Sequence, residues 1–178
     1  WPLWFWPIPL KFATLLVGFV TLALTAWLDD RGAMPPLLRF AVQGITIGLC
    51  VSALPGDVRF LSTLPLDVER GLLALAWLGF ANVFRSMDVV DGLAGSACIV
   101  LALGYISVLR VAGQESSLLP LALIIAAASL GYLFWNWPPA RVITGDVGTV
   151  SLGFLLGWLM IDLAMRAQPA AAIILPLY

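Results

Sequence analysis

The stretch GLLALAWLGFANVFRSMDVVDGLAGSACIVLALGYISVLRVA, residues 71–112, holds two apolar runs separated by a short polar segment. Each run approaches the roughly 20 apolar residues that a helix needs to cross a bilayer. A span surrounded by lipid must satisfy its own backbone hydrogen bonds, so both runs are expected to be helices. The polar segment between them carries Asp88 and Asp91, two carboxylates in an otherwise very apolar chain.

The rest of the sequence repeats this pattern. Hydrophobic residues make up 62% of the 178 residues and charged residues 11%, and the chain has no histidine. This composition excludes a soluble protein. The net charge of −1 identifies no partner, and no nucleic acid is expected. We predict an all-α, polytopic transmembrane helix bundle forming one domain over residues 1–178, with spans near 11–28, 37–54, 71–86, 92–112, 118–137 and 149–165 and a seventh from about 170.

Each span reverses the side of the membrane, so the first, third and fifth connections share one face. These connections are short and contain glycine and proline. They carry five aspartates, namely Asp29, Asp30, Asp88, Asp91 and Asp146. We therefore expect the five side chains to converge on one face. Lysine and arginine are divided almost equally between the faces, so the positive-inside rule does not show which face is cytoplasmic.

Asp88 and Asp91 are three residues apart. On a continuing helix they would be neighbours, about 5–6 Å apart at Cβ. Two carboxylates that close repel unless a cation or a proton lies between them, and hard oxygen ligands of this kind suit Mg²⁺. The alternative is that Asp88 caps a helix starting near Val89 while Asp91 is solvated at the membrane interface.

Two further segments contain aspartates at span ends. LDD, residues 28–30, ends a span, and its alternative interpretation is a pair of interfacial charges before a proline stop. TGDVGT, residues 144–149, is a glycine-rich turn before a span. Its backbone N–H groups, including that of Gly145, are suited to an anion while Asp146 holds a cation.

Three polar residues near span ends are candidates for substrate binding. Arg141 would neutralise a phosphate or else extend to the lipid headgroups. Asn82 and Asn136 need hydrogen-bond partners, and contacts between helices are the alternative for both. Asp162 lies toward the opposite side of the membrane and is left out of the site.

At this point the sequence resembles a known family. NVFRSMDVVDGLAG is similar to the N-x-x-N-x-x-D-G-x-D-G-L-A segment of the polyprenyl-phosphate N-acetylhexosamine-1-phosphate transferases, glycosyltransferase family 4, which are related to phospho-MurNAc-pentapeptide translocase. LDDRGAMPPLLRFAVQ resembles their D-D-x-x-x-L-x-P-x-x-R-x-x-x-Q segment, and FWNWPPARVITGDVGTVSLGFLLG their F-N-x-P-A-K-x-F-M-G-D-x-G-S-x-x-L-G segment. The three motifs occur in the family order.

The resemblance implies a phosphoglycosyl transfer. A UDP-N-acetylhexosamine would give its sugar-1-phosphate to undecaprenyl phosphate, releasing UMP and initiating the synthesis of a surface polysaccharide or O-antigen. The donor is made in the cytoplasm, so the aspartate face would be cytoplasmic in a multi-pass protein of the bacterial inner membrane. The lipid bilayer is an expected partner, and the sequence leaves open whether the protein forms a homodimer.

The resemblance also suggests roles for individual residues. Asp146 corresponds to the ligand of Mg²⁺, with Mn²⁺ as the alternative metal. Asp29 and Asp30 correspond to the pair that orients or deprotonates the lipid phosphate, and which of them acts as base is open. Asp88 corresponds to a catalytic polar residue beside the diphosphate. The substrate-binding positions are Asn82, Arg85, Asp91, Asn136, Arg141 and Gly145, of which Asp91 and Asn136 lie on the uridine side.

Departures from the family pattern bear on the donor pocket. Arg85 replaces a common asparagine, Val89 a glycine, and Ile143 an aromatic residue. Arg85 is three residues from Asp88, so we expect it to pair with Asp88 or with a donor phosphate, and snorkelling to headgroups is the alternative.

The family's first spans and its later histidine-containing loop have no counterpart in this sequence. The chain is therefore expected to be a fragment that is inactive by itself. The alternative function is a transporter or channel with a carboxylate cluster on one side, although transporters usually place ionisable groups within spans.

Overall fold

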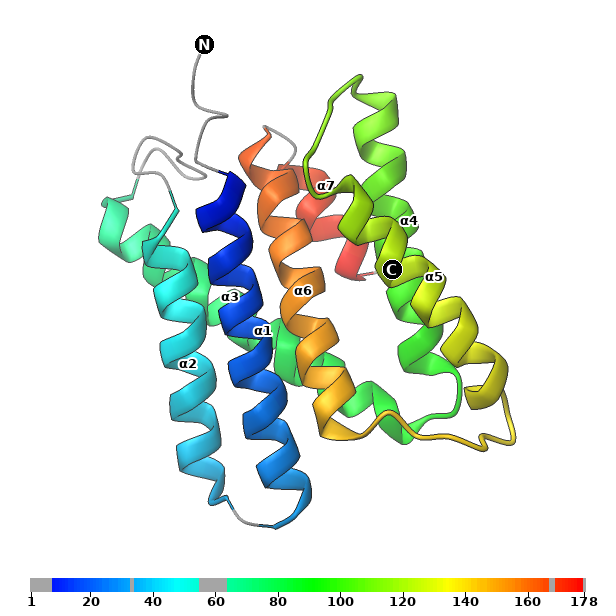
Figure 1. Ribbon diagram of the computed structural model, residues 1–178. Coiled ribbons are helices and arrows are strands. Elements are labelled where there is room, and N and C mark those ends of the chain that lie inside the picture. Colours follow the sequence, from blue (N-terminus) through cyan, green and yellow to red (C-terminus); the bar gives the residue numbers. More distant parts are fainter. Residues whose placement is uncertain (1–7, 33, 55–63, 167–168, 178) are drawn as a thin grey trace.

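The computed structural model describes residues 8–32, 34–54, 64–166 and 169–177. These residues form seven α-helices and two short 3₁₀ helices, shown in Figure 1. In chain order the elements are α1 (Ile8–Asp30), α2 (Pro36–Ser52), α3 (Leu66–Ser86), η1 (Met87–Val89), α4 (Leu93–Val111), α5 (Leu119–Asn136), α6 (Gly145–Met165), α7 (Pro169–Ile174) and η2 (Leu175–Leu177).

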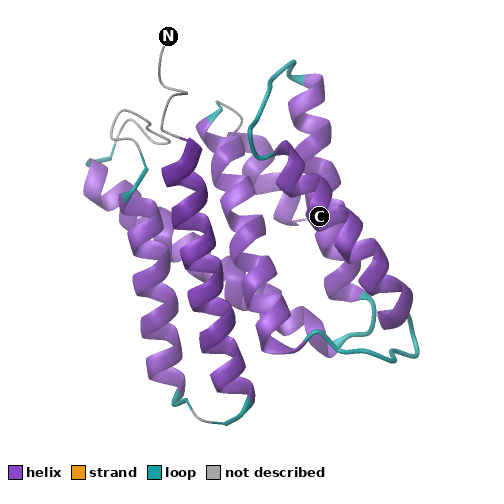
Figure 2. Ribbon diagram, viewed as in Figure 1, coloured by secondary structure: helices purple, strands orange, loops and turns teal. Residues whose placement is uncertain are grey.

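The predicted all-α membrane bundle is confirmed. The described residues contain helices and connecting segments but no strand, as Figure 2 shows. Among them, five helices are long and apolar enough to cross a membrane, and α2 is apolar but shorter. The protein is therefore a multi-pass membrane protein.

Helix α6 is the centre of the bundle. In the membrane-spanning part of α6, 72% of the residues are buried inside the protein. The corresponding share is 17% to 39% in the other four candidate spans. Figure 1 shows why: α6 lies between the α1–α2 hairpin and the α4–α5 hairpin, and α3 crosses obliquely behind it. The outward sides of the surrounding helices are rich in exposed leucine, isoleucine and valine, as expected for surfaces in contact with lipid.

Glycines let α3 and α6 approach closely. A Cβ on Gly153 would lie only 3.0 Å from the Cα of Ala81, and a Cβ on Gly157 would lie 2.2 Å from Trp77. The indole of Trp77 stacks on Phe154 with 4.9 Å between ring centroids and donates a hydrogen bond to the Phe154 carbonyl at 3.1 Å. Because lipid supplies no hydrophobic drive for helix association, such close packing is what holds the two helices together.

Helices α3 and α6 start four or five residues before the positions that the apolar pattern predicted. Helix α3 begins at Leu66, before the predicted 71, and α6 begins at Gly145, before the predicted 149. Both added turns carry acidic residues, Asp67 and Glu69 in α3 and Asp146 in α6. Carboxylates are stabilised near the amino terminus of a helix, so polar residues extend these helices beyond their apolar part.

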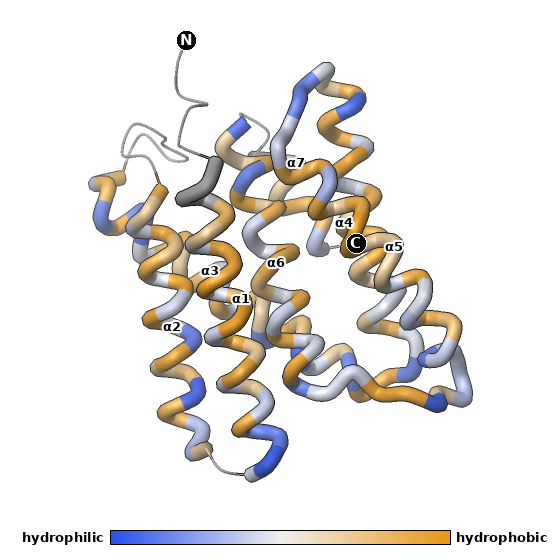
Figure 3. The backbone as a smooth tube through the Cα atoms, in the orientation of Figure 1, coloured by the Kyte–Doolittle hydropathy of each residue, from blue (hydrophilic) through white to orange (hydrophobic). Residues whose placement is uncertain are grey.

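The three aspartate-bearing connections lie at one end of the bundle, at the bottom of Figure 1, where α1 meets α2, α3 meets α4 and α5 meets α6. Figure 3 shows hydrophilic positions at this end as well as at the opposite end. The chain passes through Gly92 with φ +77, which stops the helix after η1 and lets α4 start in a new direction.

The opposite end has a buried polar cluster around Asp162. The Oδ2 atom of Asp162 accepts hydrogen bonds from Tyr105 Oη at 2.6 Å, Ser116 Oγ at 3.1 Å and Arg166 Nε at 2.7 Å. Asp162 is 2% exposed. Its charge is paired within the bundle and joins α4, the following loop and α6, so Asp162 lies apart from the other end, as the sequence indicated.

Candidate functional site

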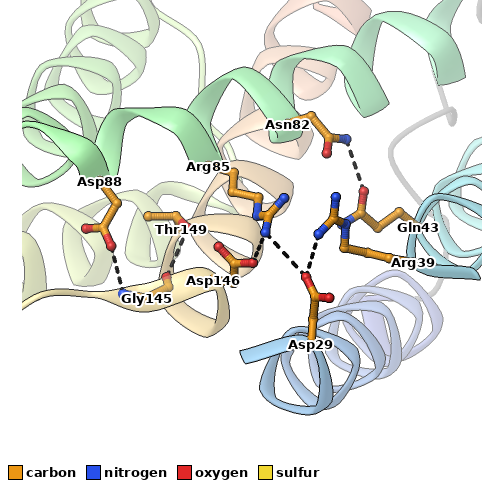
Figure 4. Close-up of polar contacts among 9 residues, drawn as sticks. All are labelled: Asp29, Arg39, Gln43, Asn82, Arg85, Asp88, Gly145, Asp146 and Thr149. Atoms are coloured by element: carbon orange, nitrogen blue, oxygen red, sulfur yellow. Dashed lines mark hydrogen bonds and ion pairs between the residues drawn. The ribbon is translucent and has the colours of Figure 1, made fainter. Parts of the chain in front are cut away.

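Arg85 lies between two aspartates from distant parts of the chain. Its Nη2 atom donates a hydrogen bond to Asp146 Oδ2 and another to Asp29 Oδ2, the latter at 3.3 Å. Arg39 Nη1 also donates to Asp29 Oδ2, at 2.6 Å. Figure 4 shows the two guanidinium groups facing the same carboxylate. The result is a chain of alternating charges, Arg39, Asp29, Arg85 and Asp146, which joins α2, α1, α3 and α6.

Local sequence positions the two groups at the α1–α2 turn. Asp29 is in the last turn of α1, and its carbonyl accepts a hydrogen bond from Gly32 N–H at 2.7 Å. Pro35 and Pro36 then start α2, since proline suits the first position of a helix. Arg39 follows one turn later and points back to Asp29. Arg39 was not among the predicted site residues, although its place in the aspartate-pair motif was a signal.

Asp30 differs from Asp29 in its surroundings. It is exposed, and no described cation forms an ion pair with it, whereas the Asp29 side chain is 11% exposed and paired twice. Asp30 also lies against the start of α6, because a Cβ built on Gly145 would be 3.2 Å from Asp30 Oδ2. Gly145 has φ +67, a conformation that glycine adopts without strain. Glycine at this position lets α6 begin beside the Asp30 carboxylate.

Asp88 contacts the start of α6 and not Arg85. Its Oδ2 accepts the Gly145 N–H at 2.8 Å and its Oδ1 accepts the Thr144 N–H at 3.3 Å. The predicted Arg85–Asp88 pair is therefore wrong, since the Arg85 guanidinium reaches Asp146 and Asp29. The anion that faces the N–H groups of this turn is a side chain of the protein itself, and Gly145 N–H is already engaged.

The two helical placements considered for Asp88 also need correction. The helix does not continue through them: Val90 is extended, at φ −111 and ψ 123, and α4 starts only at Leu93 with Gly92 as its cap. Asp88 therefore neither shares a helical face with Asp91 nor caps a helix at Val89. Asp91 is exposed, and its Oδ2 accepts the Ala140 N–H at 3.0 Å.

Asn136 fixes the same connection from within. Its Oδ1 accepts the Gly92 N–H at 2.8 Å and its Nδ2 donates to the Val142 carbonyl at 2.8 Å. Asn136 is 3% exposed, and these two hydrogen bonds satisfy both ends of its amide inside the protein. The side chain joins α5, the 137–144 connection and the start of α4.

Asn82 and Arg141 are placed differently again. Asn82 Nδ2 donates to Gln43 Oε1 at 3.0 Å, which links α3 to α2 beside Arg39. Gln43 was a second residue missed, although it follows Arg39 by four positions and so shares its helical face. The backbone N–H of Arg141 donates to the Trp135 carbonyl at 2.9 Å, and the Arg141 side chain is exposed. The predicted roles of Asn82 and Arg141 in substrate binding stay predictions.

The carboxylates at this end suit Mg²⁺ only with help from water or substrate. Among the described residues no three carboxylate, cysteine or histidine side chains lie close enough to hold a metal ion together. Mg²⁺ commonly uses one or two carboxylates and completes its shell with waters and phosphate oxygens. Asp146, with a 20% exposed side chain in the first turn of α6, fits that arrangement as a single carboxylate ligand, although its Oδ2 is paired with Arg85.

Fold and site together define a polytopic helical membrane protein with a cluster of aspartates and arginines at one membrane face. The sequence profile of glycosyl transferase family 4 matches residues 12–164. The chain therefore belongs to this family, and the predicted family is confirmed.

Three curated relatives are similar over most of the chain. A Bacillus subtilis (strain 168) protein named "Probable undecaprenyl-phosphate N-acetylglucosaminyl 1-phosphate transferase" is 27% identical over 173 residues, 94% of this chain and 48% of that protein. The phospho-N-acetylmuramoyl-pentapeptide-transferase of Streptococcus thermophilus (strain CNRZ 1066) is 30% identical, over 86% of this chain and 46% of that protein. The protein of the same name from Streptococcus pneumoniae (strain ATCC BAA-255 / R6) is 33% identical over 79% and 44%. The chain spans about half the length of the curated relatives it matches.

Proposed function

We propose that the protein transfers an N-acetylhexosamine-1-phosphate from a UDP-sugar to undecaprenyl phosphate and releases UMP. The observation that carries this proposal is the cluster formed by Asp29, Arg85 and Asp146, with Asp30 and Asp88 beside it. Guanidinium groups are suited to phosphate oxygens, and carboxylates to a dication or a proton. The relatives, whose names describe transfer of phosphosugars, support the same reaction class.

The chemistry is a displacement at phosphorus. An oxygen of the lipid phosphate forms a bond to the β-phosphorus of the UDP-sugar, and the bond between the β-phosphorus and the oxygen that bridges to the α-phosphate breaks. The bridging oxygen leaves with UMP, and the sugar stays on the new lipid diphosphate. Positioning and neutralisation of charge supply most of the rate in phosphoryl transfer.

The surroundings of the aspartate pair divide its roles. Asp29 holds Arg39 and Arg85 in place and is engaged on its Oδ2. Asp30 is exposed and forms no ion pair with a cation among the described residues. We therefore assign to Asp30 the acceptance of a proton from the lipid phosphate, and to Asp29 the positioning of the two guanidinium groups.

Asp146 would hold Mg²⁺, with Mn²⁺ as the alternative. When bound, the dication neutralises negative charge that develops on the phosphate of departing UMP. Asp88 maintains the geometry by holding the start of α6, where Asp146 is located. Asp91 and Asn136, which fix the 137–144 connection, would lie on the nucleotide side.

The membrane assignment follows from the donor. UDP-sugars are cytoplasmic, so the aspartate face would be the cytoplasmic face of a bacterial inner membrane protein. The lipid-linked product would then initiate a surface polysaccharide such as O-antigen. Both the cytoplasmic orientation and the polysaccharide product depend on the proposed transfer reaction.

The test is a UMP-release assay with the full-length protein in detergent, undecaprenyl phosphate, Mg²⁺ and UDP-N-acetylglucosamine or UDP-N-acetylgalactosamine. UMP should appear only when lipid phosphate and UDP-sugar are both present, and EDTA should stop it. Release without the lipid phosphate, or none with either donor, would contradict the proposal.

A further inference from the structure

The Arg85 guanidinium lies between two carboxylates at the charged end of the bundle. Its Nη2 contacts the Oδ2 atoms of both Asp146 and Asp29, so one positive charge neutralises two carboxylates from different helices (Figure 4). We propose that Arg85 is an exchangeable counter-ion, which leaves Asp146 when that carboxylate binds a divalent cation. The inference rests on the proposed function, because it deepens the assignment of metal to Asp146.

The geometry of Arg85 is that of a replaceable partner. A strong arginine–carboxylate pair is bidentate and uses two nitrogens of the guanidinium plane. Here both hydrogen bonds leave from Nη2, and the buried Nε has no hydrogen-bond partner among the described residues. The Arg85 side chain is 28% exposed. Arg85 can therefore leave Asp146 without losing a full set of hydrogen bonds.

The neighbouring charges would keep Arg85 near the site after it leaves. Asp29 still attracts its guanidinium, but Arg39 already holds the same Oδ2 at 2.6 Å. An anionic phosphate would offer Arg85 the acceptors that the cluster lacks, and an arginine binds phosphate through several nitrogens at once. The departure from Asp146 would thus link metal binding to phosphate binding.

The consequence is a competition that can be measured without any substrate. Removing Arg85 should strengthen the binding of a divalent cation, because the metal no longer displaces a guanidinium. A loss of positive charge anywhere nearby would also favour a cation, so the experiment needs a control at the same end of the bundle. Arg31 is a suitable control residue, because it is exposed and its Cζ atom lies 3.8 Å from the ring centroid of Trp27.

The experiment titrates Mn²⁺ alone into the full-length protein in detergent and measures free Mn²⁺ by electron paramagnetic resonance. Arg85→Gln should bind Mn²⁺ about twofold to fivefold more tightly than the unaltered protein, the range expected for loss of a partly exposed ion pair. Arg31→Gln should change the affinity less than about twofold. Equal affinities of Arg85→Gln and the unaltered protein, or an equal gain in Arg31→Gln, would overturn the inference.

Two further variants make the result decisive. Arg85→Lys keeps the charge but concentrates it on a single nitrogen, and should bind Mn²⁺ with intermediate affinity. If Arg85→Gln does not fold, Arg85→Lys takes its place in the titration. A Mn²⁺ affinity of Arg85→Lys no higher than that of the unaltered protein would then refute the inference. Asp146→Asn should abolish the binding. Undiminished binding in Asp146→Asn would remove both the metal assignment and the inference, whereas failure in the arginine variants alone leaves the transferase proposal intact.

Discussion

Asp88 accepts the backbone N–H of Gly145 at 2.8 Å, although 57 residues separate them in sequence. This hydrogen bond joins η1, which directly follows α3, to the first residue of α6 and thereby sets where the next residue, Asp146, stands relative to Arg85. A carboxylate at the amino terminus of a helix satisfies free N–H groups and interacts favourably with the helix dipole. Asp88 is therefore a positioning residue for the charge cluster.

Removing the Asp88 side chain should loosen this end of the bundle. Asp88→Ala leaves two N–H groups without their acceptors and should lower the free energy of unfolding by about 1–2 kcal/mol. Asp88→Asn keeps one acceptor oxygen and should lose less. Thermal unfolding in detergent would check the order, and equal midpoints for Asp88→Ala and the unaltered protein would refute it.

A methyl group at Gly145 should disturb the site directly. Gly145→Ala forces an alanine into φ +67 and brings its Cβ to 3.2 Å from Asp30 Oδ2. We expect a loss of about 1 kcal/mol in stability and a lower rate of UMP release. Gly131→Ala is the matched control, since nothing lies within 4 Å of its added Cβ in helix α5. If both variants behave alike, the backbone argument fails.

Asp146 should be the most sensitive carboxylate for activity. Asp146→Asn keeps the size but removes the charge that would hold Mg²⁺, and UMP release should fall by about two orders of magnitude. Asp67→Asn, at an exposed position in the first turn of α3, should retain its rate. Similar rates for the two variants at saturating Mg²⁺ would show that Asp146 is not the metal ligand.

Substitutions of the neighbouring residues Asp29 and Asp30 should have different effects on stability and on activity. Asp29→Asn removes the negative charge that Arg39 and Arg85 share, so stability should drop by about 2 kcal/mol. Asp30→Asn should leave the unfolding midpoint almost unchanged and reduce the rate of UMP release instead. Thermal unfolding and the rate assay, run on both variants, would reveal the division, and the reverse pattern would exchange the two roles.

Close packing of α3 against α6 should control the site from a distance. Gly153→Leu would push against Ala81 and Phe84, whose atoms lie 3.0 Å and 3.1 Å from the added Cβ, and should separate Arg85 from Asp146. We expect a large loss of folded protein in detergent. Gly79→Leu, on an open side of α3 with nothing within 4 Å, should be tolerated. Equal yields of folded protein would argue against the glycine contact.

Much of this architecture was predictable because lipid imposes simple rules. A chain in hydrocarbon must form helices, so apolar runs separated by polar segments predict the all-α bundle. Reversal of direction at each span then places Asp29, Asp88 and Asp146 at one end, where the structure has them. The motif order indicated the family, which the comparison confirmed.

Only the tertiary structure decided which charges meet. Spacing along a helix favoured Arg85 with Asp88, but η1 and the left-handed Gly92 end that helix, and the close α3–α6 crossing presents Asp146 to Arg85 instead. Asp88 reaches the start of α6 for the same reason. The sequence by itself determined the helices and the membrane face of each connection through local hydrophobicity, whereas ion pairing depends on distances of a few ångströms between segments far apart in the chain.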